Sequence, residues 1–96
     1  MQITKTVNGT EATLALEGWL DTLAADELKA ELEGLEEGIE FLVLDFSGLE
    51  YISSSGIRQI VAAYKKMNGR LVVKNASSGI MTIVKATGID KKISFE

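Results

Sequence analysis

The sequence predicts a single α/β domain of 96 residues, with a mixed sheet of four to five strands, an opening hairpin and three to four helices. Two observations indicate this class: apolar residues alternate with polar ones in the first segment, and later segments switch between short apolar runs and helical spacing. The resulting order is β-β-α-β-α-β-α-β, which favours strands that run parallel after the hairpin and are joined by right-handed crossovers. One domain over residues 1–96 uses the whole length.

The first elements are a hairpin and a helix. Apolar and polar residues alternate on both sides of Asn8-Gly9, a pair that adopts the left-handed conformations of a tight turn. The leucines that follow recur at helical spacing up to Gly34. We therefore expect a helix over 22–34, with Asp21 or Thr22 as its N-cap.

The later elements form strand-helix-strand units. The run at 41–44 is continuous and apolar, which is typical of a strand covered on both faces, and we expect this strand to end at Phe46 before a loop over 47–52. Tyr51 in that loop and Trp19 before the first helix are expected to be partly buried aromatic residues at the rim of the core. The remaining pattern predicts helices over 55–68 and 78–87, and strands at 70–74 and 93–95.

Three consecutive serines, Ser53, Ser54 and Ser55, lie where the buried strand meets the second helix. The first turn of a helix has backbone N–H groups without intrahelical partners, and the helix dipole favours an anion there. We expect Ser54 to be the N-cap and Ser55 to be the first helical residue, with its hydroxyl in solvent and placed to accept a phosphate. Serines are common at helix starts simply because they cap them, yet three serines are more than capping needs.

Composition excludes several classes of protein. The net charge of −4 argues against a nucleic-acid partner. Since the chain has neither cysteine nor histidine, disulfides, the usual zinc sites and Ser-His triads are absent. The glycine-rich phosphate-binding motifs and the Gly-x-Ser-x-Gly motif are also missing. We therefore expect no enzymatic activity and no cofactor.

The location of the protein is predicted from its apolar segments. The start Met1-Gln2-Ile3-Thr4 lacks the basic and apolar regions of a secretory signal, and no apolar run approaches the ~20 residues of a membrane span. We expect a soluble cytoplasmic protein that does not insert into a membrane and is monomeric alone.

Two segments carry a family resemblance. Residues 42–57 read LVLDFSGLEYISSSGI and residues 16–21 read LEGWLD. Together with the element order they resemble, over essentially the whole chain, the STAS domain of bacterial anti-sigma factor antagonists. In that family the turn reads Asp-Ser-Ser-Gly-Leu, and the serine before the glycine is phosphorylated by a partner anti-sigma factor that is itself a serine kinase. The resemblance assigns this serine to Ser55 and an acidic residue near the same pocket to Asp21, while the aspartate that opens the family turn is Ser53 here.

The resemblance implies two alternative functions. In the first, the unmodified protein binds an anti-sigma factor and frees a sigma factor, and phosphorylation of Ser55 releases the partner. In the second, the chain is a constitutive interaction subunit similar to the STAS components of lipid-transport ABC systems, and it is not phosphorylated. The serine before Gly56 favours the first, and Ser53 in place of aspartate favours the second. The predicted partner surface consists of Asp21, Ser53, Ser54, Ser55, Gly56, Ile57 and Arg58.

Overall fold

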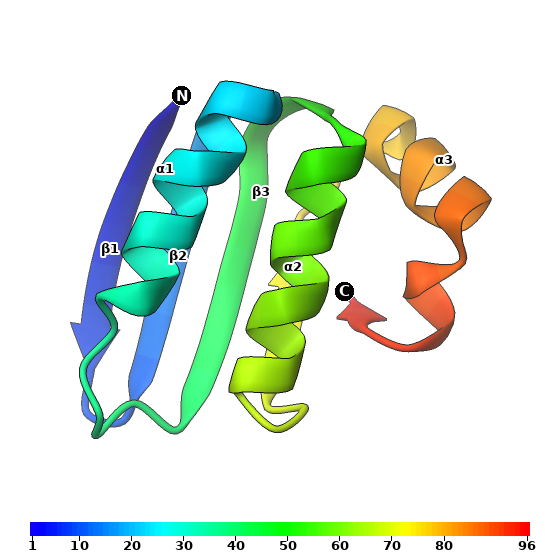
Figure 1. Ribbon diagram of the computed structural model, residues 1–96. Coiled ribbons are helices and arrows are strands. Elements are labelled where there is room, and N and C mark those ends of the chain that lie inside the picture. The colour runs from blue at the N-terminus through cyan, green and yellow to red at the C-terminus, as the bar shows by residue number, and fades with distance from the viewer.

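Five strands form one mixed sheet in the computed structural model, which describes residues 1–96 (Figure 1). The strand order along the sheet is the chain order, β1-β2-β3-β4-β5. The elements are β1 (Gln2–Asn8), β2 (Glu11–Leu20), α1 (Thr22–Glu33), β3 (Phe41–Ile52), α2 (Ser54–Lys66), β4 (Leu71–Lys74), α3 (Ser78–Thr87), the short 3-10 helix η1 (Ile89–Lys91) and β5 (Ser94–Phe95). The expected α/β class, opening hairpin and element order are confirmed.

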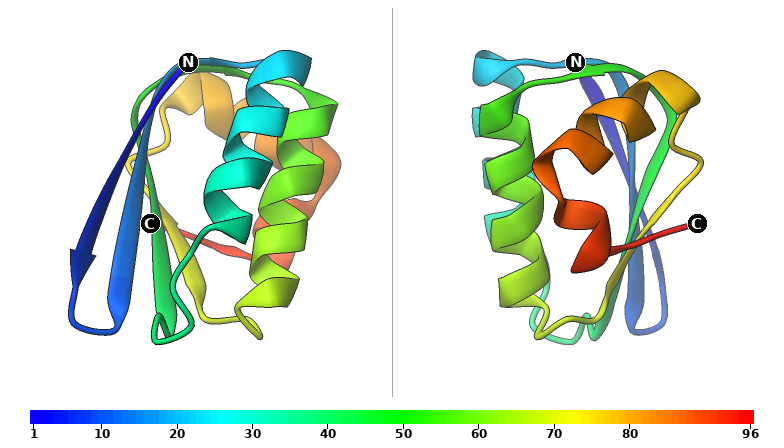
Figure 2. Two further views of the ribbon diagram at one scale, coloured as in Figure 1. Left: turned by 60° about the vertical axis from the view of Figure 1, so that its left-hand side comes forward. Right: turned by 90° about the vertical axis from the view of Figure 1, so that its right-hand side faces the viewer.

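The helices cover one face of the sheet. β1 pairs antiparallel with β2, and every later pair of neighbouring strands is parallel. Because parallel strands in sequential order with right-handed crossovers place each connecting helix on the same side, α1, α2 and α3 all lie on one side (Figure 2). No helix covers the other face. The prediction that the run at 41–44 is covered on both faces is therefore wrong.

The run at 41–44 is continuous and apolar because neighbouring strands, and not a second layer of helices, shield its outward residue. Leu42 and Leu44 point into the core between sheet and helices and are inaccessible to solvent. Val43 points to the helix-free face, where β3 is the middle strand, and its register partners on the two sides are Thr13 and Val72. These neighbours leave only 6% of Val43 exposed. An apolar residue in the middle of a sheet can thus be buried without a covering layer.

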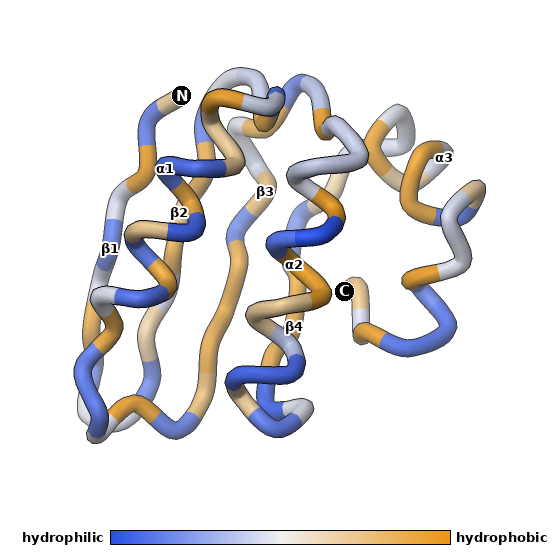
Figure 3. The backbone as a smooth tube through the Cα atoms, viewed as in Figure 1, coloured by the Kyte–Doolittle hydropathy of each residue, from blue (hydrophilic) through white to orange (hydrophobic).

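The core lies between the sheet and the helices. Its members are the inward residues of β2, β3 and β4 and the apolar stripes of the helices, and Figure 3 shows this hydrophobic lining along β3 and α2. The expected stripe of α2 is confirmed, because Ile57 and Ile60 are buried while Val61 and Tyr64 pack against the same cluster. None of the helices combines the length and apolarity needed to cross a membrane.

β3 extends beyond its predicted end at Phe46. Residues 47–52, expected as a loop, continue the strand to Ile52 and pair with the end of β2. Two register shifts interrupt this pairing, and glycines lie beside them: Gly18 has a φ of +102°, and a side chain at Gly48 would overlap that of Glu17. Bulges break the alternation of a strand, so the segment around Ser47-Gly48 has the sequence pattern of a turn.

Candidate partner-binding site at the serine turn

The site is built at one end of the sheet, where β2 and β3 end and α1 and α2 begin. The backbone N–H of Ser53 donates to the carbonyl of Leu20 at 2.8 Å, which joins the ends of the two strands. Gly56 lies against Leu20, because a β-carbon built at Gly56 would be 2.7 Å from Leu20 Cγ. Asp21 and the three serines are therefore neighbours at the carboxyl edge of a parallel sheet, the edge at which such folds carry their sites.

Ser53 is the N-cap of α2, so the prediction of Ser54 as the cap is wrong. Ser53 has extended backbone angles, and its hydroxyl accepts a hydrogen bond from the N–H of Gly56 at 3.1 Å. Because β3 runs to Ile52, the helix begins at Ser54, one residue earlier than expected. Ser55 is accordingly the second residue of the helix, and it is partly buried rather than fully in solvent.

The hydroxyls of Ser54 and Ser55 take part in none of the side-chain hydrogen bonds of the structure. Their backbone N–H groups belong to the first turn of α2 and have no intrahelical acceptor. No acidic side chain occupies this turn. The start of α2 thus presents two unengaged hydroxyls in a location that favours negative charge.

Two charged residues flank the serines. Asp21 is the N-cap of α1, as expected, and its carboxylate accepts a hydrogen bond from the N–H of Ala24 at 2.9 Å while staying exposed. Arg58 is exposed and lies three residues after Ser55, on the same side of the helix. The only ion pair of the chain joins Lys5 and Glu36, so the guanidinium of Arg58 has no carboxylate partner.

Two members of the predicted surface are buried. Gly56 is enclosed beside Leu20, and Ile57 is 8% exposed within the core cluster. Their side of the helix is not available to a partner, and both residues instead hold the start of α2 against the end of β2. The residues that remain accessible are Asp21, Ser53, Ser54, Ser55 and Arg58, and their contact with a partner stays a prediction.

An exposed aromatic pair lies beside this site. Trp19 and Tyr51 are register partners at the ends of β2 and β3, with ring centroids 5.2 Å apart. Trp19 is 59% exposed and Tyr51 is 38% exposed, which corrects the expectation of partly buried rim residues. Sequence reasoning missed their exposure because it placed Tyr51 in a loop rather than in a strand, next to Trp19.

A polar contact that the sequence did not indicate connects β3 with the segment after β4. The carboxylate of Asp45 accepts hydrogen bonds from the side-chain amide of Asn75 and from the N–H of Ser47, both at 3.0 Å. These two bonds hold the pKa of Asp45 below its usual value of 3.8, and the bond from Asn75 has the larger effect. Asn75 reaches this position with a φ of +63°, which asparagine tolerates better than most residues.

Asp45→Ala is expected to lower the free energy of unfolding by about 1 kcal/mol at neutral pH. A group whose pKa is lowered on folding contributes stability above its unfolded pKa, and this contribution is lost as the pH falls through the lower folded value. Urea unfolding of both proteins at pH 7 and at about pH 2 measures the effect. A difference that stays constant between these pH values would contradict the ionic origin of the contribution.

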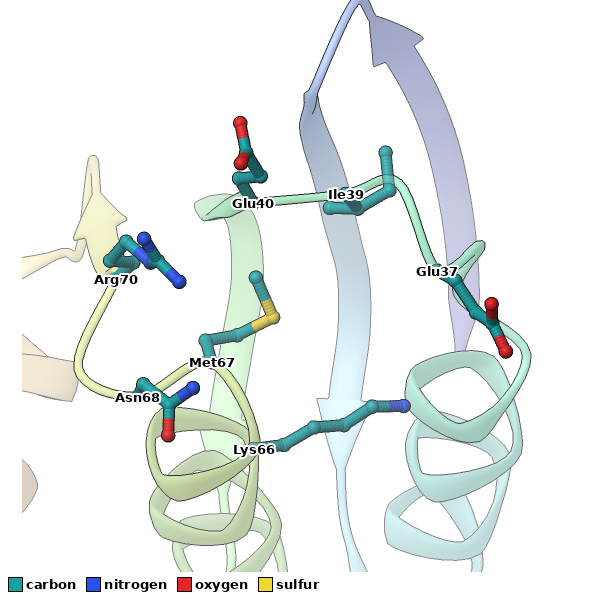
Figure 4. Close-up of a pocket in the computed structure, with 7 residues that line it drawn as sticks. All are labelled: Glu37, Ile39, Glu40, Lys66, Met67, Asn68 and Arg70. Carbon is teal, nitrogen blue, oxygen red and sulfur yellow. The ribbon is translucent and has the colours of Figure 1, made fainter.

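The largest hollows lie at the other end of the molecule. An open cavity of about 320 Å³ lies between the end of α2 and the loop after α1. Figure 4 shows its lining residues, among them Glu37, Lys66 and Arg70. Lys66 extends toward α1 and donates to the carbonyl of Leu32. No group of three acidic side chains converges to hold a metal ion. The serine turn is therefore the best candidate site although no cavity marks it.

The fold is a two-layer α/β domain with a sequentially ordered mixed sheet, and the serine turn lies at the carboxyl edge of its parallel strands. The sequence model of the STAS domain family matches residues 2–96 of this chain. The chain therefore belongs to the STAS domain family.

Solved structures share this fold at low sequence identity. An anti-sigma factor antagonist from Mycobacterium paratuberculosis superposes with a TM-score of 0.87 at 20% identity, covering 98% of this chain and 83% of that one. The Bacillus cell fate determinant SpoIIAA in its phosphorylated form gives a TM-score of 0.76 at 17% identity, covering 99% and 91%. A sulfate transporter family protein from Wolinella succinogenes gives 0.79 at 18%, covering 95% and 80%. At these identities the likeness establishes the fold alone.

Proposed function

We propose that the protein is an anti-sigma factor antagonist, which binds an anti-sigma factor with serine kinase activity through the serine turn and is released when that kinase phosphorylates Ser55. The observation that carries the proposal is the unengaged hydroxyl of Ser55 in the first turn of α2, directly before Gly56. Anti-sigma factor antagonists among the structural relatives support it. In this proposal the chain is a monomeric cytoplasmic protein, with no catalytic activity, cofactor or nucleic-acid partner of its own.

The local electrostatics are suitable for such a switch. A phosphoserine adds a charge of about −1.5 to −2 and three acceptor oxygens. The free N–H groups at the start of α2 and the guanidinium of Arg58, three residues away, stabilise that charge within the protein. In an interface built on this edge, the same charge has to lose its water next to the exposed carboxylates of Asp21 and Glu50, and this desolvation weakens the interface.

The change from the family's aspartate to Ser53 leaves the shape of the turn intact. Aspartate and serine are both good N-caps, and Ser53 caps α2 through the N–H of Gly56. What the serine lacks is the negative charge that would help to position the kinase's metal–nucleotide complex. We therefore propose that Ser53 slows phosphorylation of Ser55 without preventing it.

Incubation with the cognate kinase and ATP is expected to add one phosphate, at Ser55. Ser55→Ala should abolish labelling and keep the fold, whereas Ser53→Asp should speed labelling because it restores the charge of the family turn. Intact-mass and fragment mass spectrometry measures both the stoichiometry and the position. Phosphate on Ser53 or Ser54 would show that the wrong serine was assigned.

The second candidate is a constitutive interaction subunit in a transport assembly. Ser53 in place of aspartate favours it, and the sulfate transporter family protein with a similar fold supports it. The labelling experiment separates the two functions. Tight binding to a kinase-type partner without any phosphate transfer would favour the constitutive role.

A further inference from the structure

The large exposed hydrophobic residues are concentrated at the end of the molecule that carries the serine turn. Trp19, Leu23 and Tyr51 lie there, with Trp19 and Leu23 59% and 78% exposed. Trp19 and Tyr51 come two residues before the two helix caps, Asp21 and Ser53, so the aromatic pair borders the turn directly. The other two large exposed hydrophobic residues, Val7 and Phe41, lie at the opposite end of the sheet.

The aromatic pair faces away from the helices. Leu20 and Ile52 turn into the core and are almost completely buried. Because successive side chains of a strand alternate between the faces of a sheet, the preceding residues, Trp19 and Tyr51, point to the helix-free face. Their rings contact each other, with centroids 5.2 Å apart, and both residues are exposed to solvent. Trp19 is the only tryptophan of the chain, and the fold leaves most of its surface in water.

The surroundings of the pair are acidic and unpaired. Glu17 precedes Trp19 by two residues on the same face, Glu50 is next to Tyr51, and Asp21 follows at the turn. All three carboxylates are exposed, and none takes part in an ion pair. Aromatic anchors surrounded by carboxylates complement an apolar pocket that is bordered by lysine or arginine side chains.

We infer that the partner-binding surface continues from the serine turn onto the helix-free face of the sheet. There Trp19, supported by Tyr51, inserts into an apolar pocket of the same protein partner, and lysine or arginine side chains border this pocket. This inference rests on the proposed function, since the partner is the kinase-type anti-sigma factor. The turn provides regulation by charge, and the aromatic pair provides affinity by burial. Phosphorylation of Ser55 then weakens an interface in which Trp19, the residue that contributes most of the buried area, lies on β2 and outside the modified helix.

Calorimetric titration with the cognate kinase tests the inference. Trp19→Ala is expected to weaken binding about tenfold and Tyr51→Ala by roughly threefold to tenfold, whereas Trp19→Phe should retain part of the affinity. Phe41→Ala is the matched control, because Phe41 is 37% exposed, close to the 38% of Tyr51, yet lies at the far end of the same strand. It should change binding by less than about twofold. Melting temperatures close to that of the wild type exclude folding defects.

A spectroscopic readout reports on burial itself. With 5-fluorotryptophan incorporated into this chain alone, the single fluorine resonance belongs to Trp19. It should shift and lose its exposure to solvent when the kinase binds. Equal affinities of the wild type and Trp19→Ala for the kinase, with an unshifted resonance, would overturn the inference and leave the switch standing.

Two further outcomes are distinct from that one. A wild-type chain that no kinase-type partner binds would overturn the proposed function, and the inference with it. If sedimentation shows that the wild type self-associates and that Trp19→Ala does not, the occupant of the aromatic pair is a second copy of this chain, and the inference is overturned in favour of a homodimer.

Discussion

Ser55→Asp is expected to weaken binding of the anti-sigma factor by more than tenfold, or roughly 1.4 kcal/mol or more, while changing the free energy of unfolding by less than about 1 kcal/mol. The two effects separate because the charge has different surroundings in the free protein and in the complex. In the free protein, an acid in the first turn of α2 meets unpartnered N–H groups and no other acidic residue of that turn. In the complex, it lies among the exposed carboxylates at this edge and is removed from water.

Two matched variants isolate the charge at this position. Ser55→Asn has nearly the size of aspartate without its charge, so its affinity should lie much closer to that of the wild type. Ser78→Asp places the same charge in the first turn of α3, which is also capped by a serine, Ser77, and it should leave the affinity unchanged. Binding calorimetry and thermal melting provide the two readouts. Unchanged affinity of Ser55→Asp would remove Ser55 from the interface, and a collapsed melting temperature would indicate a folding defect instead of a switch.

Most of the architecture could be predicted from local sequence. The hairpin was predicted, but its turn residues are Gly9 and Thr10 instead of Asn8 and Gly9, because Asn8 still pairs with Glu11 and only Gly9 has a positive φ, of +64°. The apolar spacing predicted three helices whose ends lie within two residues of the observed ones. The pattern failed where tertiary structure overrides local periodicity. The two bulges beside Gly18 and Gly48 interrupt the alternation of apolar residues, so the second half of β3 was predicted as a loop. Val43 is shielded by its strand neighbours, so its burial was attributed to a second covering layer.

The candidate site was predicted in position but not in detail. Three serines at a strand-to-helix junction indicated a helix start, and α2 begins within one residue of the predicted position. Which serine caps the helix depends on where β3 ends, and that end is determined by pairing with Leu20 on another strand. The proximity of Trp19 to Tyr51 likewise depends on the register between β2 and β3, 32 residues apart in the chain, which no local pattern encodes.

Leu20→Ala and Gly56→Ala are expected to be less damaging together than the sum of their separate effects. Leu20 is completely buried, so Leu20→Ala should lower the free energy of unfolding by about 2–5 kcal/mol. Gly56→Ala places a methyl group 2.7 Å from Leu20 Cγ and 3.1 Å from the Leu20 carbonyl oxygen, and this overlap should cost about 1–3 kcal/mol, less the gain of up to about 1 kcal/mol in helix propensity.

In the double variant, the methyl group introduced by Gly56→Ala enters the space that the leucine side chain has left. The overlap with side-chain atoms is thereby removed, although the approach to the backbone carbonyl remains, so a favourable coupling of about 0.5–1.5 kcal/mol is expected. Gly79→Ala is the control, because Gly79 lies in the first turn of α3 and a β-carbon built there has its nearest tertiary contact at 3.9 Å, with Ser77 Oγ. This variant should be slightly more stable than the wild type.

Chemical denaturation of the four proteins of the cycle measures the coupling, and the rate of Ser55 phosphorylation links it to function. The carbonyl of Leu20 accepts the hydrogen bond from the N–H of Ser53 and its side chain packs against Gly56, so Leu20 holds both ends of the serine turn. Gly56→Ala should therefore slow phosphorylation more than its loss of stability alone requires, because it displaces the start of α2 relative to Asp21. Additive unfolding energies, with phosphorylation unaffected, would show that the close contact between Leu20 and Gly56 does not position the serines.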